Sequence, residues 1–202
     1  MKSKLRTGIL AVLGFMLIFS APLVASMEEQ PVEFKNRGLE LAIREEIGEA
    51  IGAVYPSDLE KVKDLDATFE EIKDLSVLKY CKNLKYADLR YNNISNLSPL
   101  SELTNLEVLW LKDNNISDIS PLSSLFHLRR LWLQVNNIST IQPLVENFKV
   151  KENGNENGLG KGDTVKLQQN SLDLSEGSEN LQDIQTLLDR GVEVKFHPQK
   201  NK

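Results

Sequence analysis

Apolar and polar residues follow one short pattern that recurs between Leu84 and Leu144. Each copy has apolar residues, mostly leucines, at spacings of three and then two, followed by an Asn and an Ile, as in LEVLWLKDNNISDI. The alternation of Leu109 and Leu111 is typical of a strand with one buried face. After the Asn, apolar residues fall at every third position, which favours turns and tight 3₁₀ helix. Each copy therefore predicts one short strand and a compact return path.

The copies repeat with a constant period of 22 residues. One copy cannot bury its own leucines, so neighbouring copies must stack and share a core. A period of about 20–29 residues with the pattern L-x-x-L-x-L-x-x-N is the signature of a leucine-rich repeat. We therefore expect an α/β leucine-rich-repeat solenoid with a curved parallel sheet on its concave face. The columns that define the period are Leu84, Leu106 and Leu128; Asn92, Asn114 and Asn136; and Pro99, Pro121 and Pro143.

The recurring Asn is expected to be structural. It stands where the chain leaves the strand and turns inward, and its amide can bond backbone groups that no sheet ladder pairs. A catalytic amide is the less favoured interpretation. The expected structural ladder consists of Asn92, Asn114, Asn136 and Asn170.

Residues 1–26 have the pattern of a signal peptide. Lys2, Lys4 and Arg6 precede the apolar run GILAVLGFMLIF, and small residues follow up to Ser26. This order predicts export and cleavage after Ser26, with a retained membrane anchor as the alternative, although the run is short for a span of about 20 residues. Cleavage removes three positive charges from a chain of net charge −5 and leaves −8. Such an acidic chain argues against nucleic acid and anionic lipid as partners.

The N-terminal end of the solenoid is expected to be closed by helices. Residues 27–58 predict a helical cap that begins at Asn36 and includes a second helical turn, with a capping box formed by Ser57 and Glu60. Four 22-residue repeats follow over residues 59–149, and the first of them lacks the Asn. Terminal repeats are commonly atypical, so this degenerate unit is expected to begin the stack.

The C-terminal end departs from the regular spacing. The stretch Lys149 to Gly162 is rich in Gly, Asn and charge and predicts a loop. Residues 150–202 then continue with a fifth, larger repeat that starts at Val165 and ends in an alternating strand over Val192–Phe196. Between them lies an expected closing helix with its apolar face formed by Leu181, Ile184 and Leu188.

The chain offers no set of residues suited to catalysis. His127 stands in a loop column otherwise occupied by Asn, and the other histidine, His197, lies in the tail. The single Cys81 occupies a leucine column and is expected to be a buried core thiol. No metal-ligand spacing, nucleophile elbow or phosphate loop is present, so we expect no cofactor, no metal and no enzymatic activity. One acidic group on the expected concave face is interpreted as a hydrated surface rather than a calcium site: Asp64, Asp66 and Asp88.

These motifs resemble the internalin-like, 22-residue class of bacterial leucine-rich-repeat proteins. The resemblance rests on the NNIS(D/N)(I/L)SPL units, the segment FKNRGLELAIREEIG and the lead-in LDATFEEIKDLSVL, and it covers the chain from Phe34 to Leu144. It implies the solenoid fold and the binding of another protein through the concave sheet. No immunoglobulin-like domain or sorting signal follows the repeats, so the resemblance does not imply wall attachment or host-cell invasion.

The residues that alternate with the buried leucines are expected to face the partner. Trp110 and Trp132 fall in one column, one strand spacing apart. Trp, Tyr and Arg dominate protein interfaces, and an exposed aromatic pair among charges usually marks a contact site. The expected partner-binding residues are Tyr86, Asp88, Arg90, Val108, Trp110, Lys112, Arg130, Trp132 and Gln134.

The predicted function is non-enzymatic protein binding by an exported module of unknown oligomeric state. One alternative is a carbohydrate-binding module of the cell envelope, in which Trp110 and Trp132 serve as platforms for sugars. Another is an inhibitory or regulatory subunit of an exported enzyme. The tryptophans could also stack on one another without a partner, or form a contact between two copies of the chain.

Overall fold

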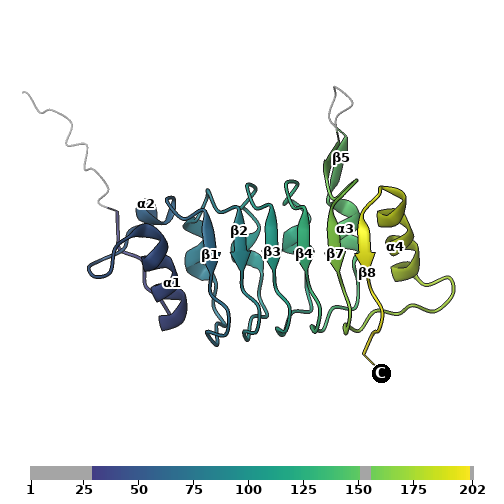
Figure 1. The fold of residues 1–202 in the computed structure, drawn as a ribbon, viewed down its shortest axis with the longest axis horizontal. Coiled ribbons are helices and arrows are strands. Elements are labelled where there is room, and N and C mark those ends of the chain that lie inside the picture. The colour runs from purple at the N-terminus through teal and green to yellow at the C-terminus, as the bar shows by residue number, and fades with distance from the viewer. Residues whose placement is uncertain (1–28, 151–155, 201–202) are drawn as a thin grey trace, which may run out of the picture.

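The computed structural model describes residues 29–150 and 156–200 (Figure 1). The segment expected to be a signal peptide, residues 1–26, lies outside the described residues. Within them, six short strands form one parallel sheet, and a separate antiparallel pair stands beside it. In order across the large sheet the strands are β1 (Asp64–Asp66), β2 (Tyr86–Asp88), β3 (Val108–Trp110), β4 (Arg130–Trp132), β7 (Thr164–Lys166) and β8 (Glu193–Lys195).

Each coil contributes a strand of three residues in matching register. Leu109 pairs with Ala87 on one side and with Leu131 on the other, and Leu131 pairs in turn with Val165. These middle residues point into the core and are fully buried. Parallel strands lie roughly 4.8 Å apart, so identical positions of successive coils stand side by side. The predicted leucine-rich-repeat solenoid is confirmed.

The return path of each coil runs through one tight helical turn on the far side of the core (Figure 1). In three of these turns, Pro at an early position fixes the backbone for helix entry, and the leucine that follows is buried. Cys81 is also fully buried, which raises the pKa of its thiol to about 12. The turns are the 3₁₀ helices η1 (Ser76–Tyr80), η2 (Ser98–Leu100) and η3 (Ser120–Leu122) and the short helix α3 (Gln142–Glu146).

Helix α1 (Arg37–Ile47) covers the first edge of the sheet. Its N-cap is Asn36, whose side chain accepts a hydrogen bond from Leu39 N at 2.7 Å. Leu39 and Ile43 are buried, and the helix ends at Gly48 in the left-handed conformation, with φ 73°. A glycine tolerates this backbone because it has no Cβ.

The second helical turn, α2 (Pro56–Leu59), begins earlier than the sequence suggested. The predicted capping box of Ser57 and Glu60 is wrong, because the N-cap is Tyr55, whose backbone N–H donates to Asp58 Oδ2 at 3.0 Å. Proline at the first helical position sets the start of the turn. Ser57 lies inside it, and its N–H and hydroxyl donate to the carboxylate of Glu29 at 2.8 and 2.6 Å.

The stretch predicted as a loop after Leu144 contains an antiparallel strand pair, so that prediction is wrong in part. β5 (Phe148–Val150) pairs with β6 (Glu156–Gly158). The pair is held to the solenoid by backbone bonds, from Gly158 N to Phe126 O at 2.9 Å and from Leu159 N to Asn147 O at 3.2 Å. Phe126 belongs to the preceding coil, and a contact of this kind cannot be read from local composition.

The closing helix α4 (Glu179–Asp189) packs beside α3 and β8 and ends the stack. Its buried apolar residues are Ile184 and Leu187. Leu188, expected on the apolar face, is 41% exposed. Leu187 and Leu188 lie about 100° apart around the helix, and the face that packs on the solenoid carries Leu187.

Candidate binding surface

One face of the six-stranded sheet is not covered by the helical turns, which lie across the core from it (Figure 1). We call it the open sheet face; it corresponds to the face expected to be concave. The first and third residues of each strand project there. The third residues, joined by strand register, form what we call the central row: Asp66, Asp88, Trp110, Trp132, Lys166 and Lys195.

An aromatic stack lies in the middle of this row. The rings of Trp110 and Trp132 are nearly parallel, at 15°, with centroids 4.4 Å apart. Tyr86 contacts Trp110 edge to face, at 5.2 Å and 78°. On β7, Lys166 places its Nζ 3.6 Å from the centroid of Trp132. The side chains thus form a continuous series over four adjacent strands.

The flat surfaces of the Trp132 indole are both occupied. Trp110 covers the face toward β3, and the ammonium of Lys166 lies over the face toward β7. A cation over an indole face is held by the ring quadrupole. Both tryptophans remain half-buried rather than fully buried, so part of each indole reaches the surface.

Arg90 and Asp88 form a tight ion pair beside the stack. Arg90 Nε donates to both carboxylate oxygens of Asp88, at 2.8 and 3.0 Å, and Nη2 donates to Oδ2 at 2.6 Å. This hydrogen bonding raises the pKa of Arg90. The guanidinium carbon lies 4.8 Å from the Trp110 centroid and 5.7 Å from that of Trp132, so it sits beside the stacked pair.

The expected hydrated acidic surface is therefore wrong for Asp88, which is only 1% exposed. Arg90 and the neighbouring aromatic rings exclude water from this carboxylate, whereas Asp64 and Asp66 are exposed. The environment also acts on Tyr86: burial, and then the carboxylates of Asp88 and Asp66, raise the pKa of its phenol to about 12.

A second aromatic contact lies at the strand exits. Lys112 Nζ donates to the hydroxyl of Tyr91 at 2.8 Å, and Tyr91 stacks on Phe69 with centroids 4.3 Å apart. Phe69 is 69% exposed and was not among the expected binding residues. It stands 22 positions before Tyr91 in the same column, so the repeat register could have identified it.

The remaining predicted residues are spread over the same face. Val108 and Gln134 are half-buried and Arg130 is exposed. Three polar atoms in this region are buried without a hydrogen-bond partner, namely Trp110 Nε1, Gln134 Oε1 and Gln168 Oε1. Each such group carries a desolvation cost of about 1–3 kcal/mol.

The Asn ladder lies at the strand exits, and its side chains are hydrogen-bonded within the fold. Asn114 Oδ1 accepts from Ile94 N at 2.9 Å, and its Nδ2 donates to Leu89 O and Leu111 O at 3.0 and 3.1 Å. Asn92, Asn136 and Asn170 make the equivalent bonds to the coil that precedes each of them. These amides are positioned by their bonds to the backbone.

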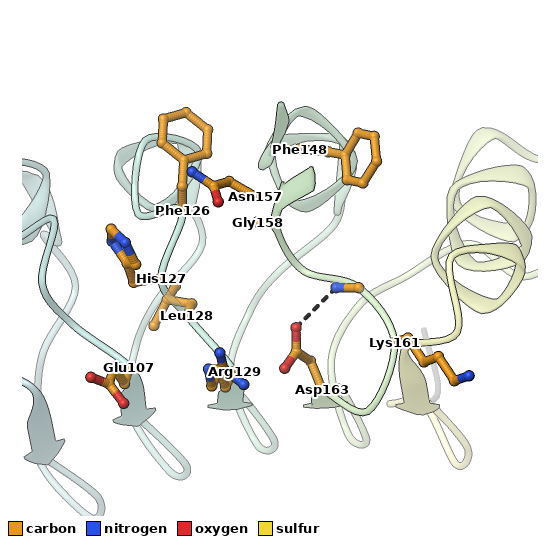
Figure 2. A pocket seen from close by; sticks show the side chains of 11 residues that line it. Glu107, Phe126, His127, Leu128, Arg129, Phe148, Asn157, Gly158, Lys161 and Asp163 are labelled. Carbon is orange, nitrogen blue, oxygen red and sulfur yellow. Dashed lines mark hydrogen bonds between the residues drawn. The ribbon is translucent and has the colours of Figure 1, made fainter. Parts of the chain in front are cut away.

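A pocket of about 370 Å³ opens at the other end of the strands, before β3, β4 and β7 (Figure 2). Figure 2 shows Asp163 bonded to a backbone nitrogen, which is Gly160 N at 2.9 Å. Burial raises the pKa of Asp163. His127 is also tied to the fold, with Nδ1 2.7 Å from Thr104 O. Asp163 and His127 are therefore both engaged in hydrogen bonds with the backbone.

The described residues contain no group of three His, Cys, Asp or Glu side chains placed to hold a metal ion. Among these same residues, no helix has both the length and the apolar character needed to span a bilayer.

The comparisons with known proteins agree with this architecture. Residues 82–124 match the family model described as Leucine Rich repeats (2 copies). An internalin (inlF) from Listeria monocytogenes aligns with a TM-score of 0.58 at 24% identity, over 85% of this chain and 60% of that one. This chain has a leucine-rich-repeat solenoid fold like that of the internalins. The functional domain of InlJ, also from Listeria monocytogenes, aligns with a TM-score of 0.57 at 20% identity, over 70% of this chain and 29% of that one.

The leucine-rich-repeat chain thus spans less than two thirds of the length of either structure. No curated protein sequence matches it. The InlJ domain is described as including a cysteine ladder; here Cys81 is the single cysteine and leucine occupies its column in the next coil.

Proposed function

We propose that this leucine-rich-repeat protein is exported and binds another protein, without enzymatic activity, through its open sheet face. The fold itself is that of a protein-interaction module. Export is supported by the signal-peptide pattern of residues 1–26. The centre of the binding surface is the aromatic stack of Trp110 and Trp132.

The observation that carries the proposal is the composition of this stack. Two parallel indoles, a tyrosine, an arginine and a lysine lie together on a sheet face that the helical turns leave uncovered. Half-buried aromatic and Arg side chains are the residues whose truncation most often costs more than about 2 kcal/mol of binding free energy. They are held rigidly by their neighbours, so little conformational entropy is lost on binding.

The same geometry argues against a sugar platform. A pyranose ring stacks on a free aromatic face, but both faces of Trp132 are already covered, by Trp110 and by Lys166. A sugar could reach this indole only after Lys166 moved away. Protein side chains, by contrast, can pack against ring edges and the adjacent charges.

The test is a quantitative comparison of tryptophan variants. A partner is captured from the extracellular fraction with the wild-type chain, purified, and titrated by calorimetry against wild type and Trp132→Ala. We expect at least a tenfold weaker affinity for Trp132→Ala, because the truncation opens the stack and leaves Lys166 without its aromatic contact. Far-UV circular dichroism checks that the variant is folded.

Tyr80→Ala is the matched control. Tyr80 is also a half-buried aromatic residue with a lysine over its ring, Lys79 at 4.8 Å, but it belongs to η1 on the helical side. Its truncation should leave partner affinity within twofold. Equal affinity of wild type and folded Trp132→Ala would exclude the open sheet face as the binding site.

A further inference from the structure

The open sheet face has opposite charges at its two ends. Along the central row, Asp66 lies on the first strand and Lys195 on the last, and both are exposed. The aromatic stack lies between them. Because the row crosses five strand spacings of about 4.8 Å, its charged ends are roughly 24 Å apart.

Neighbouring residues reinforce this separation. Asp64 adds a second exposed carboxylate at the β1 end, while Asp88 is neutralised by Arg90. At the other end, Lys166 and the exposed Arg130 add to Lys195. One carboxylate opposes the trend there, since Glu193 lies 3.0 Å from Lys195 Nζ. Because Lys195 and Glu193 form this ion pair, the net positive charge at the far end is carried by Lys166 and Arg130. The β1 end remains acidic.

We propose that the partner presents to this face an extended polypeptide segment with basic residues at one end, apolar or aromatic residues in the middle and acidic residues at the other. The proposal rests on the proposed function and specifies the chemistry of its partner. At about 3.3 Å per extended residue, roughly seven residues span the row. Basic residues of the segment lie over Asp64 and Asp66, and acidic residues lie over Lys166 and Lys195.

A polypeptide fits this surface better than other polymers. A nucleic acid or an anionic glycan would be attracted by the lysines but repelled by the aspartates. A neutral glycan would use neither end. A polypeptide, by contrast, can carry basic, apolar and acidic side chains in this order along one short segment.

The experiment selects peptides from a random twelve-residue library displayed on phage, using the full chain at low salt. We expect the enriched peptides to carry basic and acidic residues at opposite ends, about seven residues apart, with aromatic or aliphatic residues between them. Their synthetic versions should bind at least tenfold more weakly to Trp132→Ala.

Charge exchange then tests the ends directly. In the double variant Asp66→Lys/Lys195→Glu, both substituted positions are exposed, so the fold should be preserved. A selected peptide should bind this variant at least fivefold more weakly than wild type. The same peptide with its basic and acidic residues exchanged should show the opposite preference. Higher salt should reduce both differences, since exposed charges are screened.

The other outcomes are decisive in different ways. Peptides that require Trp132 but show no charge order, or that bind the exchanged variant equally well, would overturn this inference and leave the proposed function standing. Peptides indifferent to Trp132 would count against both. Failure to enrich any peptide, or preferential binding of a soluble peptidoglycan fragment or of heparin, would overturn the extended polypeptide as the occupant.

Discussion

At the scale of single residues, the recurring asparagine satisfies backbone groups of two coils at once. Asn114 bonds Leu111 O in its own coil and Ile94 N and Leu89 O in the preceding one. These groups are buried, and no strand pairing reaches them because the chain is turning. The amide therefore acts as a substitute for a ladder hydrogen bond.

Replacing this amide should be costly. We expect Asn114→Ala to lower the free energy of unfolding by about 2–4 kcal/mol, because buried backbone groups lose their partners. Urea denaturation followed by circular dichroism measures the change. The adjacent Asn115 is exposed and provides the control, since Asn115→Ala should change stability by less than about 0.5 kcal/mol. Similar losses for both variants would contradict a structural role for the ladder.

A second residue-scale feature is a column of left-handed backbone at the strand exits. Tyr91, Asp113 and Val135 have φ of 60, 59 and 57°. Asn and Asp tolerate this region, whereas a β-branched residue there is strained.

Relief of this strain should stabilise the protein. We expect Val135→Asn to raise the free energy of unfolding by about 0.5–1 kcal/mol. The backbone strain that is relieved should exceed the free energy lost with the half-buried valine side chain. Asp113→Asn, at the equivalent position of the preceding coil, should be close to neutral. Thermal and urea unfolding of both variants check this, and a destabilised Val135→Asn would show that the side chain contributes more than its backbone costs.

At the scale of elements, the 3₁₀ turns share one capping arrangement. The side chains of Asp74, Asn96 and Asp118 accept from the backbone N–H two residues later, at 2.8–2.9 Å. The positions are again 22 residues apart. Hydrogen bonds from Ser76, and then from Lys35, lower the pKa of Asp74 to about 2.

This cap predicts a specific pH dependence. In the folded protein the pKa of the Asp74 carboxyl lies below its ordinary value of 3.8. The contribution of this group to stability is therefore present above about pH 4 and is lost as the pH falls toward 2. Asp74→Asn keeps an acceptor, as Asn96 does in the next coil, but does not titrate there. Its stability should fall less steeply between pH 5 and 2 than that of wild type. Parallel acid dependences in urea unfolding would refute the assignment.

At the scale of the whole molecule, each coil contacts mainly its two neighbours, and the helices α1 and α4 close the ends. The strand register pairs residues that are 22 positions apart. If one full period is removed, the chain therefore continues from one coil into the equivalent position of the next coil.

Excision of residues 87–108 should therefore preserve the fold. Tyr86 would be followed by Leu109, the structural equivalent of Ala87. We expect cooperative unfolding with a smaller m-value, because less surface is buried. Retaining one more residue, by excising only 87–107, moves Leu84 and Leu109 out of their common register, and one of them must leave the core. That variant should be markedly less stable, and equal stability of the two deletions would contradict the stacked-coil architecture.

How far the architecture was predictable depended on whether a feature repeats. The strand positions, the buried leucine columns and the burial of Cys81 follow from the 22-residue period, because residues one period apart occupy equivalent positions in stacked coils. Features that depend on one unrepeated contact were not predicted. They include the burial of Asp88 behind Arg90, the choice of Leu187 over Leu188, and the strand pair β5–β6.

The binding surface divides in the same way. By itself, the sequence determined that Trp110 and Trp132 would be neighbours on the sheet face, since strand alternation and the period leave no other arrangement. Only the tertiary structure decided how the rings lie: parallel, with Lys166 over one face and Arg90 beside both. A period specifies which backbone positions meet. The orientation of a side chain depends on its contacts with different residues from adjacent coils, and no local pattern in the chain encodes those contacts.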